Sequence, residues 1–223
     1  MLIADSGSTK AEWCLIREGR NKIVETQGAS PYFLNEAQLV ELMRNELLPG
    51  LKKELPDQVF FYGTGCAAPA NRALVKRAIK KVFPRAEAEV AHDLTGAGRA
   101  LCGKTKGIVA ILGTGSNSGY YNGQRIAKNS PVLGYILGDE GSGAYLGRKV
   151  LQYYLYHTFD EELESRFNHK YHTEAAEILD RVYKKPLPNR YIASYAMFLA
   201  ENRGHFMIEN IIEDGLNDFF FKH

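Results

Sequence analysis

The sequence predicts an α/β protein in which one arrangement of strands occurs twice. Apolar or alternating runs typical of strands are interleaved with amphipathic helical patterns. A strand, a turn rich in Gly, Ser and Thr, a strand, a turn and a third strand begin at Leu2, and this order returns just after Lys106. The 223 residues are 45% hydrophobic, which suffices for one large domain or two small ones. We therefore expect an internal duplication of architecture.

The first half is expected to begin with an antiparallel meander of three short strands. An amphipathic helix follows, with apolar residues at helical spacing and a stop at Pro49-Gly50. Two strands that each lead into a helix complete this half. The expected strands are 2–4, 11–17, 22–26, 58–62 and 88–91, and the expected helices are 35–48, 71–82 and 94–101.

The second half opens with another meander and then becomes mostly helical. Asn122-Gly123 is the strongest two-residue signal for a hairpin turn and separates two of its strands. No low-complexity linker joins the halves, so the boundary near residues 104–107 is expected to be a tight hinge. The expected strands are 108–112, 118–121 and 124–127, and the expected helices are 143–156, 174–183, 191–201 and 207–221.

Composition excludes several classes of function. The 28 Lys and Arg residues nearly balance the 26 Asp and Glu residues, so the chain lacks the basic character of proteins that bind nucleic acid or anionic membranes. Apolar runs are too short to span a bilayer, and Asp5 interrupts the first of them, so we expect a cytoplasmic protein. Cys14, Cys66 and Cys102 form no CxxC pair, which favours buried free thiols over disulfides or a zinc site.

Two turns have the composition of phosphate-binding hairpins. In Asp5-Ser6-Gly7-Ser8-Thr9-Lys10, a strand ends in a carboxylate suited to Mg²⁺, and the turn offers backbone N–H groups and hydroxyls to a phosphate. Alone, this segment is better explained as an ordinary turn. Gly113-Thr114-Gly115-Ser116-Asn117 repeats the device in the second half, and the pair favours a ligand-binding cleft. Each turn leads into a strand, which excludes a Walker A loop and a GxGxxG dinucleotide motif.

Acidic residues at two junctions have two interpretations. Asp139 and Glu140, within the segment 138–143 that precedes a helix, are typical of a helix cap, but the surrounding glycines favour close approach of a ligand. Asp93 follows a strand and precedes a helix, where capping is the default role. A carboxylate at that place could also accept a hydroxyl proton, as phosphoryl transfer to an alcohol requires.

Taken together, the two hairpins, the acid between them and the Gly-Asp-Glu-Gly-Ser segment resemble the sugar kinase, Hsp70 and actin superfamily. Within it, the sequence is most similar to the BadF/BadG/BcrA/BcrD ATPase group and its N-acetylglucosamine kinase members, over roughly residues 1–150. The resemblance implies an α/β fold of two ribonuclease H-like (actin-like ATPase) domains around a cleft. The expected domains are residues 1–105 and residues 106–223, the second with a helical region.

The resemblance also implies roles for individual residues. Asp93 falls where these kinases keep the carboxylate that activates the sugar hydroxyl, and Asp5 where Mg²⁺ is organised. Ser30 stands where N-acetylglucosamine kinases tend to carry Asn, with Asn35 as the substitute, and residues 132–134 replace a Gly-Trp-Gly-like stretch. Both departures touch the sugar pocket, so the acceptor sugar is less fixed than the reaction. The implied ATP contacts are Gly7, Ser8, Thr9, Lys10, Gly113, Thr114 and Gly115, and the implied amino-sugar contacts are Ser30, Asn35, Ser116, Asn117, Gly134 and Asp139.

The expected activity is transfer of the γ-phosphoryl group of ATP, with Mg²⁺, to N-acetylglucosamine to give its 6-phosphate. The partners are then ATP and an amino sugar, and a homodimer is left open. An alternative is an activator ATPase of the 2-hydroxyacyl-CoA dehydratase type, which needs cysteines around an iron–sulfur cluster, yet no cysteine follows the second hairpin. A catalytically silent sugar-binding regulator is the third interpretation, and the presence of Asp93 argues against it.

The helical end of the sequence lacks a feature that the resemblance leads us to expect. Kinases of this superfamily hold adenine and ribose in a Gly-rich turn after the helical region, but beyond Gly147 the chain has only the isolated Gly204 and Gly215. The second domain is therefore expected to be incomplete at its C-terminus and to lack the adenosine-binding motif. We expect weak ATP binding, little kinase activity and a tendency to aggregate.

Overall fold

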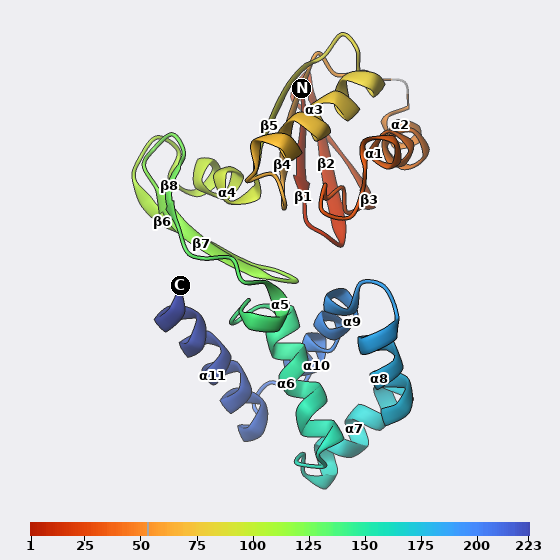
Figure 1. Ribbon diagram of the computed structural model, residues 1–223, viewed down its shortest axis with the longest axis vertical. Coiled ribbons are helices and arrows are strands. Elements are labelled where there is room, and N and C mark those ends of the chain that lie inside the picture. The colour runs from red at the N-terminus through yellow and green to blue at the C-terminus, as the bar shows by residue number, and fades with distance from the viewer. Residues whose placement is uncertain (53) are drawn as a thin grey trace. The chain divides into compact units, whose positions relative to one another are not determined.

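The computed structural model describes residues 1–52 and 54–223, which divide into two compact units (Figure 1). The first unit contains residues 1–109 and 119–128, and the second contains residues 110–118 and 129–223. The chain thus passes between the units three times within the second meander. The expected domains, 1–105 and 106–223, are a different division and stay a prediction.

A five-stranded sheet forms the centre of the first unit. Its strands lie in the order β3-β2-β1-β4-β5, with β1, β2 and β3 antiparallel and β1, β4 and β5 parallel. Ser6 pairs with Gly63, and Gly63 pairs with His92, so the carboxyl ends of the parallel strands meet at one edge. This is the strand order of a ribonuclease H-like domain. The strands are β1 (Leu2–Ser6), β2 (Lys10–Arg17), β3 (Arg20–Gln27), β4 (Gln58–Gly63) and β5 (Glu87–His92).

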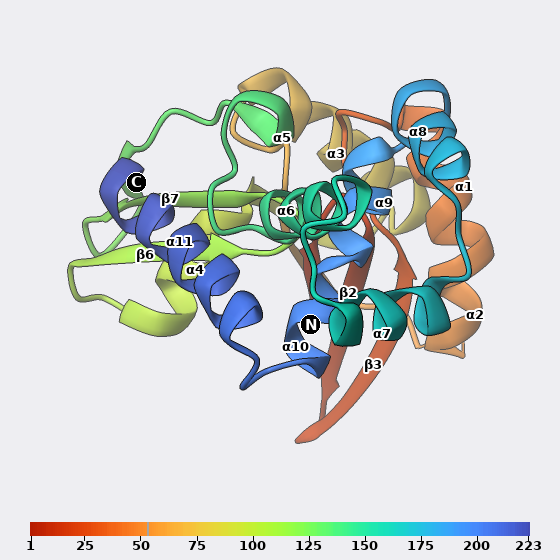
Figure 2. The same cartoon turned by 90° about the horizontal axis from the view of Figure 1, so that it is seen from below.

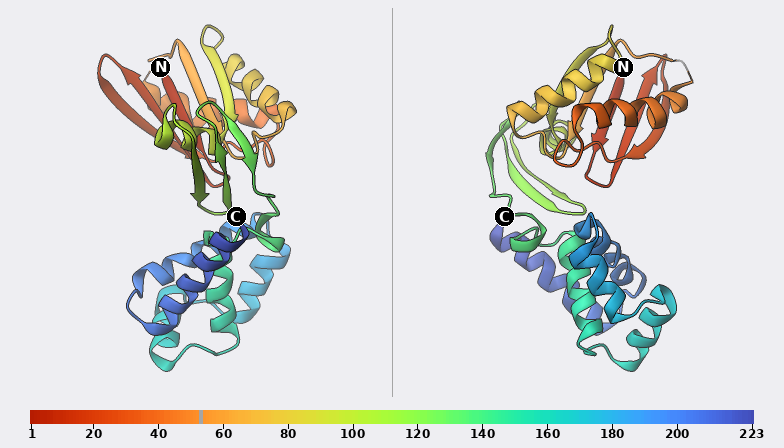
Figure 3. Two further views of the ribbon diagram at one scale, coloured as in Figure 1. Left: turned by 90° about the vertical axis from the view of Figure 1, so that its left-hand side faces the viewer. Right: turned by 45° about the vertical axis from the view of Figure 1, so that its right-hand side comes forward.

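Helices cover both faces of this sheet. The face of Phe61 carries α1 (Glu36–Leu42) and α3 (Pro69–Val82), which pack against each other over a core that includes Trp13 (Figure 3, right). Side chains alternate along a strand, and Tyr62 on the other face lies against Gly96 of α4 (Asp93–Cys102). The helix α4 therefore begins directly at the carboxyl edge.

The first expected helix is longer than Pro49 and Gly50 suggested. After α1 the chain continues through a π-helical turn, Met43–Leu47, into α2 (Leu48–Leu51). Pro49 lies in the first turn of α2, where its missing N–H costs little, so the proline does not end the helical segment. The stop predicted at this proline was wrong.

The second meander forms a three-stranded sheet in the order β6-β7-β8. The strands are β6 (Gly107–Leu112), β7 (Ser116–Tyr121) and β8 (Ile126–Asn129). The turn between β7 and β8 is the one predicted from Asn122-Gly123: the Asn122 backbone N–H donates to the Arg125 carbonyl at 3.1 Å. This confirms the strand-turn-strand pattern read from the second half.

Seven helices follow in the described part of the second unit. Figure 2 shows α6 end-on, and α9, α10 and α11 pack against it around a second core that contains Phe167 and Phe198. The sequence analysis missed α7, because its polar segment buries only Leu163 and Phe167. The helices are α5 (Gly134–Leu137), α6 (Gly143–Leu155), α7 (Glu161–Tyr171), α8 (Ala175–Lys184), α9 (Pro188–Ser194), α10 (Ala196–Glu201) and α11 (Phe206–Lys222).

Two further expectations meet the structure here. No helix among the described residues combines the length and the apolar character needed to cross a bilayer. The cysteines are free thiols, but only Cys66 is buried, while Cys14 and Cys102 are half-buried. The expectation of buried thiols therefore holds fully for Cys66 alone.

Candidate functional site

The first candidate site lies at the carboxyl edge of the five-stranded sheet. The turn between β1 and β2 is closed by the Gly7 N–H, which donates to the Lys10 carbonyl at 2.9 Å. The segment after β3 supports this turn, since the Gly28 N–H donates to the Thr9 carbonyl at 3.1 Å. A Cβ at Gly28 would lie 2.5 Å from the Gly7 carbonyl oxygen, so only glycine fits beneath the hairpin. The predicted phosphate-binding residues 7–10 thus form one supported turn.

Ser30 is brought to the same edge, whereas Asn35 is used differently. The Ser30 hydroxyl is buried and lies 3.5 Å from the Thr64 carbonyl, and the Thr64 N–H donates to the Ser6 carbonyl at 2.9 Å. Asn35 is the N-cap of α1: its side chain accepts from the Gln38 N–H at 3.0 Å in a reciprocal capping box. The structure therefore accounts for Asn35 as a helix cap without any ligand.

Asp93 follows β5 and is the first residue of α4, with its side chain 16% exposed. Its Oδ1 accepts from the Leu94 N–H at 2.7 Å and lies 3.1 Å from Nδ1 of His92. The N-cap position belongs to His92, so Asp93 is not the capping residue. Among the described residues, both polar contacts of the Asp93 carboxylate involve Oδ1, so Oδ2 keeps its capacity to accept a hydrogen bond.

Asp5 on β1 and Asp93 at the start of α4 repel each other electrostatically. The pKa of Asp5 is raised, chiefly by partial burial and then by the carboxylates of Asp93 and Glu12. Burial, reinforced by Asp93, raises the pKa of the Cys66 thiol to about 12, so this thiol stays protonated at neutral pH. The edge is thus an acidic, partly desolvated place where a bound cation would relieve repulsion.

The residues present fit Mg²⁺ held largely through phosphate oxygens. In the described residues no group of three or more His, Cys, Asp and Glu side chains could enclose a metal ion. Mg²⁺ usually keeps several waters and takes one or two carboxylates together with substrate phosphates. Asp5 at the end of β1, next to the hairpin, supplies a carboxylate of this kind.

The second candidate site surrounds the turn between β6 and β7. The Gly113 N–H donates to the Gly115 carbonyl at 2.9 Å and closes the turn. The first turn of α6 is attached to it, because the Gly143 N–H donates to the Gly113 carbonyl at 2.8 Å and the Ala144 N–H to the Thr114 carbonyl at 3.0 Å. The predicted second hairpin is therefore fixed by a helix N-terminus.

Asp139 lies against this turn in a strained conformation. Its φ of +56° is in the left-handed region, which a non-glycine residue rarely adopts. Its Oδ2 is so close to Gly115 that a Cβ there would lie 2.8 Å away. Burial raises the pKa of Asp139, and the backbone N–H of Ser116 opposes that shift. Ser142, not Asp139, caps α6, so the capping interpretation of Asp139 is wrong.

Two predicted sugar contacts are buried without partners. The Ser116 hydroxyl and the Asn117 side-chain oxygen accept or donate no hydrogen bond within the described residues. A buried polar group without a hydrogen-bond partner lowers the stability of the folded state by its desolvation free energy. A bound ligand that supplies the missing partner is one explanation for such groups. Gly134 differs, since its φ of +74° at the start of α5 explains the glycine by backbone conformation alone.

Sequence reasoning missed several residues that shape these sites. Ser6 is fully buried and its Oγ accepts from the Ala29 N–H at 3.0 Å, which attaches the segment after β3 to β1. Thr64 connects Ser30 to the end of β1. Gly63-Thr64-Gly65 directly after a parallel strand was the available signal. No local signal pointed to Ser6, because its partner is 23 residues away.

Comparison with known proteins identifies the family. No protein-family model matches the chain, and a search of curated proteins finds no match. Among solved structures, the chain is similar to the putative N-acetylglucosamine kinase of Porphyromonas gingivalis, with 38% identity and a TM-score of 0.95 over 100% of this chain and 80% of that one. This chain belongs to the same protein family.

A more distant structure supports the fold alone. The putative N-acetylglucosamine kinase of Chromobacterium violaceum is 17% identical, with a TM-score of 0.68 over 97% of this chain and 81% of that one. The α/β fold of the sugar kinase and actin-like ATPase class, expected from the sequence, is confirmed. The Porphyromonas gingivalis structure matches this fold over the whole of the present chain.

Proposed function

We propose that the protein transfers the γ-phosphoryl group of ATP to an amino sugar, with N-acetylglucosamine as acceptor and its 6-phosphate as product. The observation that carries this proposal is the 38% identity to a family member named for that activity. The chemistry of the two candidate sites agrees with it, since phosphoryl transfer needs a base, phosphate-binding N–H groups and a cation.

In the first unit, we assign Asp93 as the general base. Its carboxylate would accept the proton of the sugar hydroxyl as that oxygen forms a bond to the γ-phosphorus and the bond to ADP breaks. The turn residues Gly7, Ser8, Thr9 and Lys10 would bind phosphate oxygens through the hairpin that Gly28 supports. Mg²⁺, held through Asp5, would neutralise charge on the phosphates.

In the second unit, we assign Gly113, Thr114 and Gly115 to the phosphates. The remaining polar groups suit a sugar, because a pocket built to hydrogen-bond hydroxyls leaves unpaired groups when it is empty. Asp139, held beside Gly115, would accept a hydrogen bond from a sugar hydroxyl. The proposed sugar contacts are Ser116, Asn117, Gly134 and Asp139 in the second unit and Ser30 in the first.

The finer assignments are also proposals. We place the protein in the BadF/BadG/BcrA/BcrD ATPase group, with domains 1–105 and 106–223, a cytoplasmic location and ATP and Mg²⁺ as cofactors, and we leave a homodimer open. No observation favours the activator ATPase. Stoichiometric iron with a visible absorption band in the aerobically purified protein would move the assignment to that class.

The test is phosphate transfer from γ-labelled ATP to a panel of hexoses and amino sugars. Long incubation detects slow turnover, and phosphorus NMR identifies the position of the new phosphate. We expect N-acetylglucosamine 6-phosphate, dependent on Mg²⁺ and lost in Asp93→Asn. Transfer to no amino sugar, or transfer unaffected by Asp93→Asn, would contradict the proposal.

A further inference from the structure

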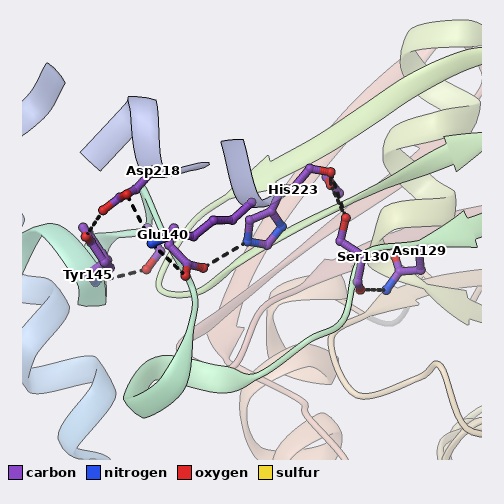
Figure 4. A network of polar contacts seen from close by, with 9 residues as sticks. Asn129, Ser130, Glu140, Tyr145, Asp218 and His223 are labelled. Carbon is purple, nitrogen blue, oxygen red and sulfur yellow. Dashed lines mark hydrogen bonds and ion pairs between the residues drawn. The ribbon is translucent and has the colours of Figure 1, made fainter. Parts of the chain in front are cut away.

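The last turn of α11 is attached to the segment that carries Asp139 (Figure 4). The Glu140 carboxylate, only 12% exposed, lies 3.7 Å from Nζ of Lys222 through Oε1. Its Oε2 lies 3.3 Å from Nε2 of His223. Glu140, which follows Asp139 directly, thus connects this segment to the end of α11, more than 80 residues away in the sequence.

The end of α11 is itself fixed to β7. The backbone carbonyl of His223 accepts from the Ser118 hydroxyl at 3.2 Å and from the Ser130 hydroxyl at 2.9 Å. The His223 ring is 6% exposed and stacks on Phe219, with ring centroids 4.8 Å apart. Ser118 lies two residues beyond Ser116 on the same strand, so the partner of Glu140 is held next to the second candidate site.

A third attachment joins α11 to α6. The Tyr145 hydroxyl donates to Asp218, whose other oxygen lies 3.2 Å from Nζ of Lys222. Burial and the nearby Asp218 raise the pKa of Tyr145 to about 12, so it remains a donor at neutral pH. The first turn of α6 also binds the carbonyls of Gly113 and Thr114, so α11 is linked through α6 to the turn of the second candidate site.

We propose that Glu140 is a positioning residue that acts through Asp139. Its bonds to Lys222 and His223 hold the segment so that Asp139 keeps its left-handed backbone, with the carboxylate against Gly115. A non-glycine residue in that region is held there only by its surroundings. The Ser142 N–H to Asp139 carbonyl bond, 3.1 Å long, lies within the same segment and cannot fix it to the rest of the unit. The Ser116 N–H bonds to the Asp139 carboxylate, which attaches the side chain of Asp139, and not its backbone, to β7. The consequence for sugar binding rests on the proposed function.

The experiment compares three variants by two measurements. Glu140→Ala removes the attachment, and Glu140→Gln keeps one carbonyl oxygen for a His223 N–H donor but loses the attraction to Lys222. Glu209→Ala is the matched control, because Glu209 at the start of α11 bonds to Arg203 at 2.7 and 3.0 Å, distant in sequence from the clamped end of the helix. Amide hydrogen exchange over residues 138–143 reports the segment, and calorimetric titration with N-acetylglucosamine reports the site.

We expect Glu140→Ala to speed exchange of the Ser142 amide by on the order of 10-fold, because the segment opens more often. The Kd for the sugar should rise about 10-fold, since misplacing one contact group weakens a preorganised site. Glu140→Gln should fall between the wild type and Glu140→Ala. Glu209→Ala should leave exchange at 138–143 and the Kd within about 2-fold of the wild type, as changes at distant sites act independently.

Three outcomes would overturn the proposal. Wild-type exchange in Glu140→Ala would show that the attachment does not hold the segment. Faster exchange with an unchanged Kd would show that it holds the segment without positioning Asp139. Equal effects in Glu209→Ala would assign them to general destabilisation of α11. If the wild type binds no amino sugar, the proposed function fails, and the exchange data alone decide whether Glu140 holds the segment.

Discussion

The two hairpins share a strand-turn-strand pattern but differ in where their carboxylate comes from. In the first, Asp5 lies on the strand that enters the turn and is repelled by Asp93. In the second, the equivalent strand ends in Leu112, and the carboxylate is Asp139, partly buried and supplied by the segment before α6. The carboxylate beside the first turn therefore comes from the strand itself, and the one beside the second turn comes from a separate segment.

The hairpins differ equally in how their polar groups are satisfied. Ser6 in the first is bonded to the Ala29 N–H, so that part of the edge is complete without a ligand. In the second, the Ser116 hydroxyl and the Asn117 side-chain oxygen are buried and have no hydrogen-bond partner among the described residues. The same local motif thus has its buried serine hydroxyl hydrogen-bonded in the first hairpin and unpaired, among the described residues, in the second.

The largest expected effect is the loss of turnover when the proposed base, which lies at the first site only, is removed. In an enzyme with a complete second domain, Asp93→Asn should lower turnover by on the order of 10²-fold or more while leaving the fold nearly intact, because the amide cannot accept the hydroxyl proton. Turnover and circular dichroism measure the two parts of this prediction. Asp57→Asn is the matched control, as Asp57 precedes β4 at the opposite edge of the same sheet. Near-wild-type turnover in Asp93→Asn would remove the base assignment.

A second variant pair tests how each turn is supported. Gly28→Ala places a Cβ 2.5 Å from backbone atoms of Gly7 and Ser8, which cannot yield locally. It should cost about 1–3 kcal/mol of unfolding free energy, as overpacking does. Gly115→Ala meets only the end of the Asp139 side chain, at 2.8 Å. It should weaken sugar binding with a smaller loss of stability. Denaturant unfolding measures the loss of stability, and calorimetric titration measures sugar binding. A larger loss of stability in Gly115→Ala than in Gly28→Ala would contradict this interpretation.

A third pair contrasts unpaired and paired hydroxyls on β7. Ser116→Ala removes a buried group without a partner, so stability should stay level or rise while the Kd for the sugar increases by about 10-fold. Ser118→Ala breaks contacts to Ser130 and His223 and should cost about 1 kcal/mol. Thermal unfolding and titration of both proteins measure the contrast. A loss of stability in Ser116→Ala would show that its hydroxyl is paired.

The smallest effect concerns the acidic edge of the first unit. Because the pKa of Asp5 is raised in the folded state, ionisation of Asp5 opposes folding: its contribution is most favourable below the unfolded-state pKa and is lost as pH rises through the folded-state pKa. Asp5→Asn should therefore raise Tm by about 1–2 °C at pH 7, with a smaller gain at acidic pH.

Magnesium provides the control for this prediction. Mg²⁺ with ATP should raise the Tm of the wild type more than that of Asp5→Asn, since a ligand stabilises only the state that binds it. An equal Mg²⁺ response in both proteins would remove Asp5 from the metal assignment.

Local patterns made the strands, the hairpins and the Asp93 junction predictable, because each depends on neighbouring residues. Ser6, Ser30 and Glu140 depend on partners 23 to 83 residues away, which no local pattern reveals. The left-handed backbone of Asp139 also has no local signal in the sequence. Likewise α7 lacks an apolar stripe, as its core contribution is limited to two residues.

The separate hydrophobic cores of the two units have a consequence for how the protein melts. One core surrounds Trp13 and Phe61, and the other surrounds Phe167 and Phe198, with no buried residue in common. Elements that pack in one core unfold together, and the two units have separate cores. A heating scan should therefore resolve two transitions rather than one. A ligand held by one unit would delay only the transition of that unit. Calorimetric scans with sugar alone and with Mg-ATP alone would then show which unit contributes most of the binding free energy for each substrate.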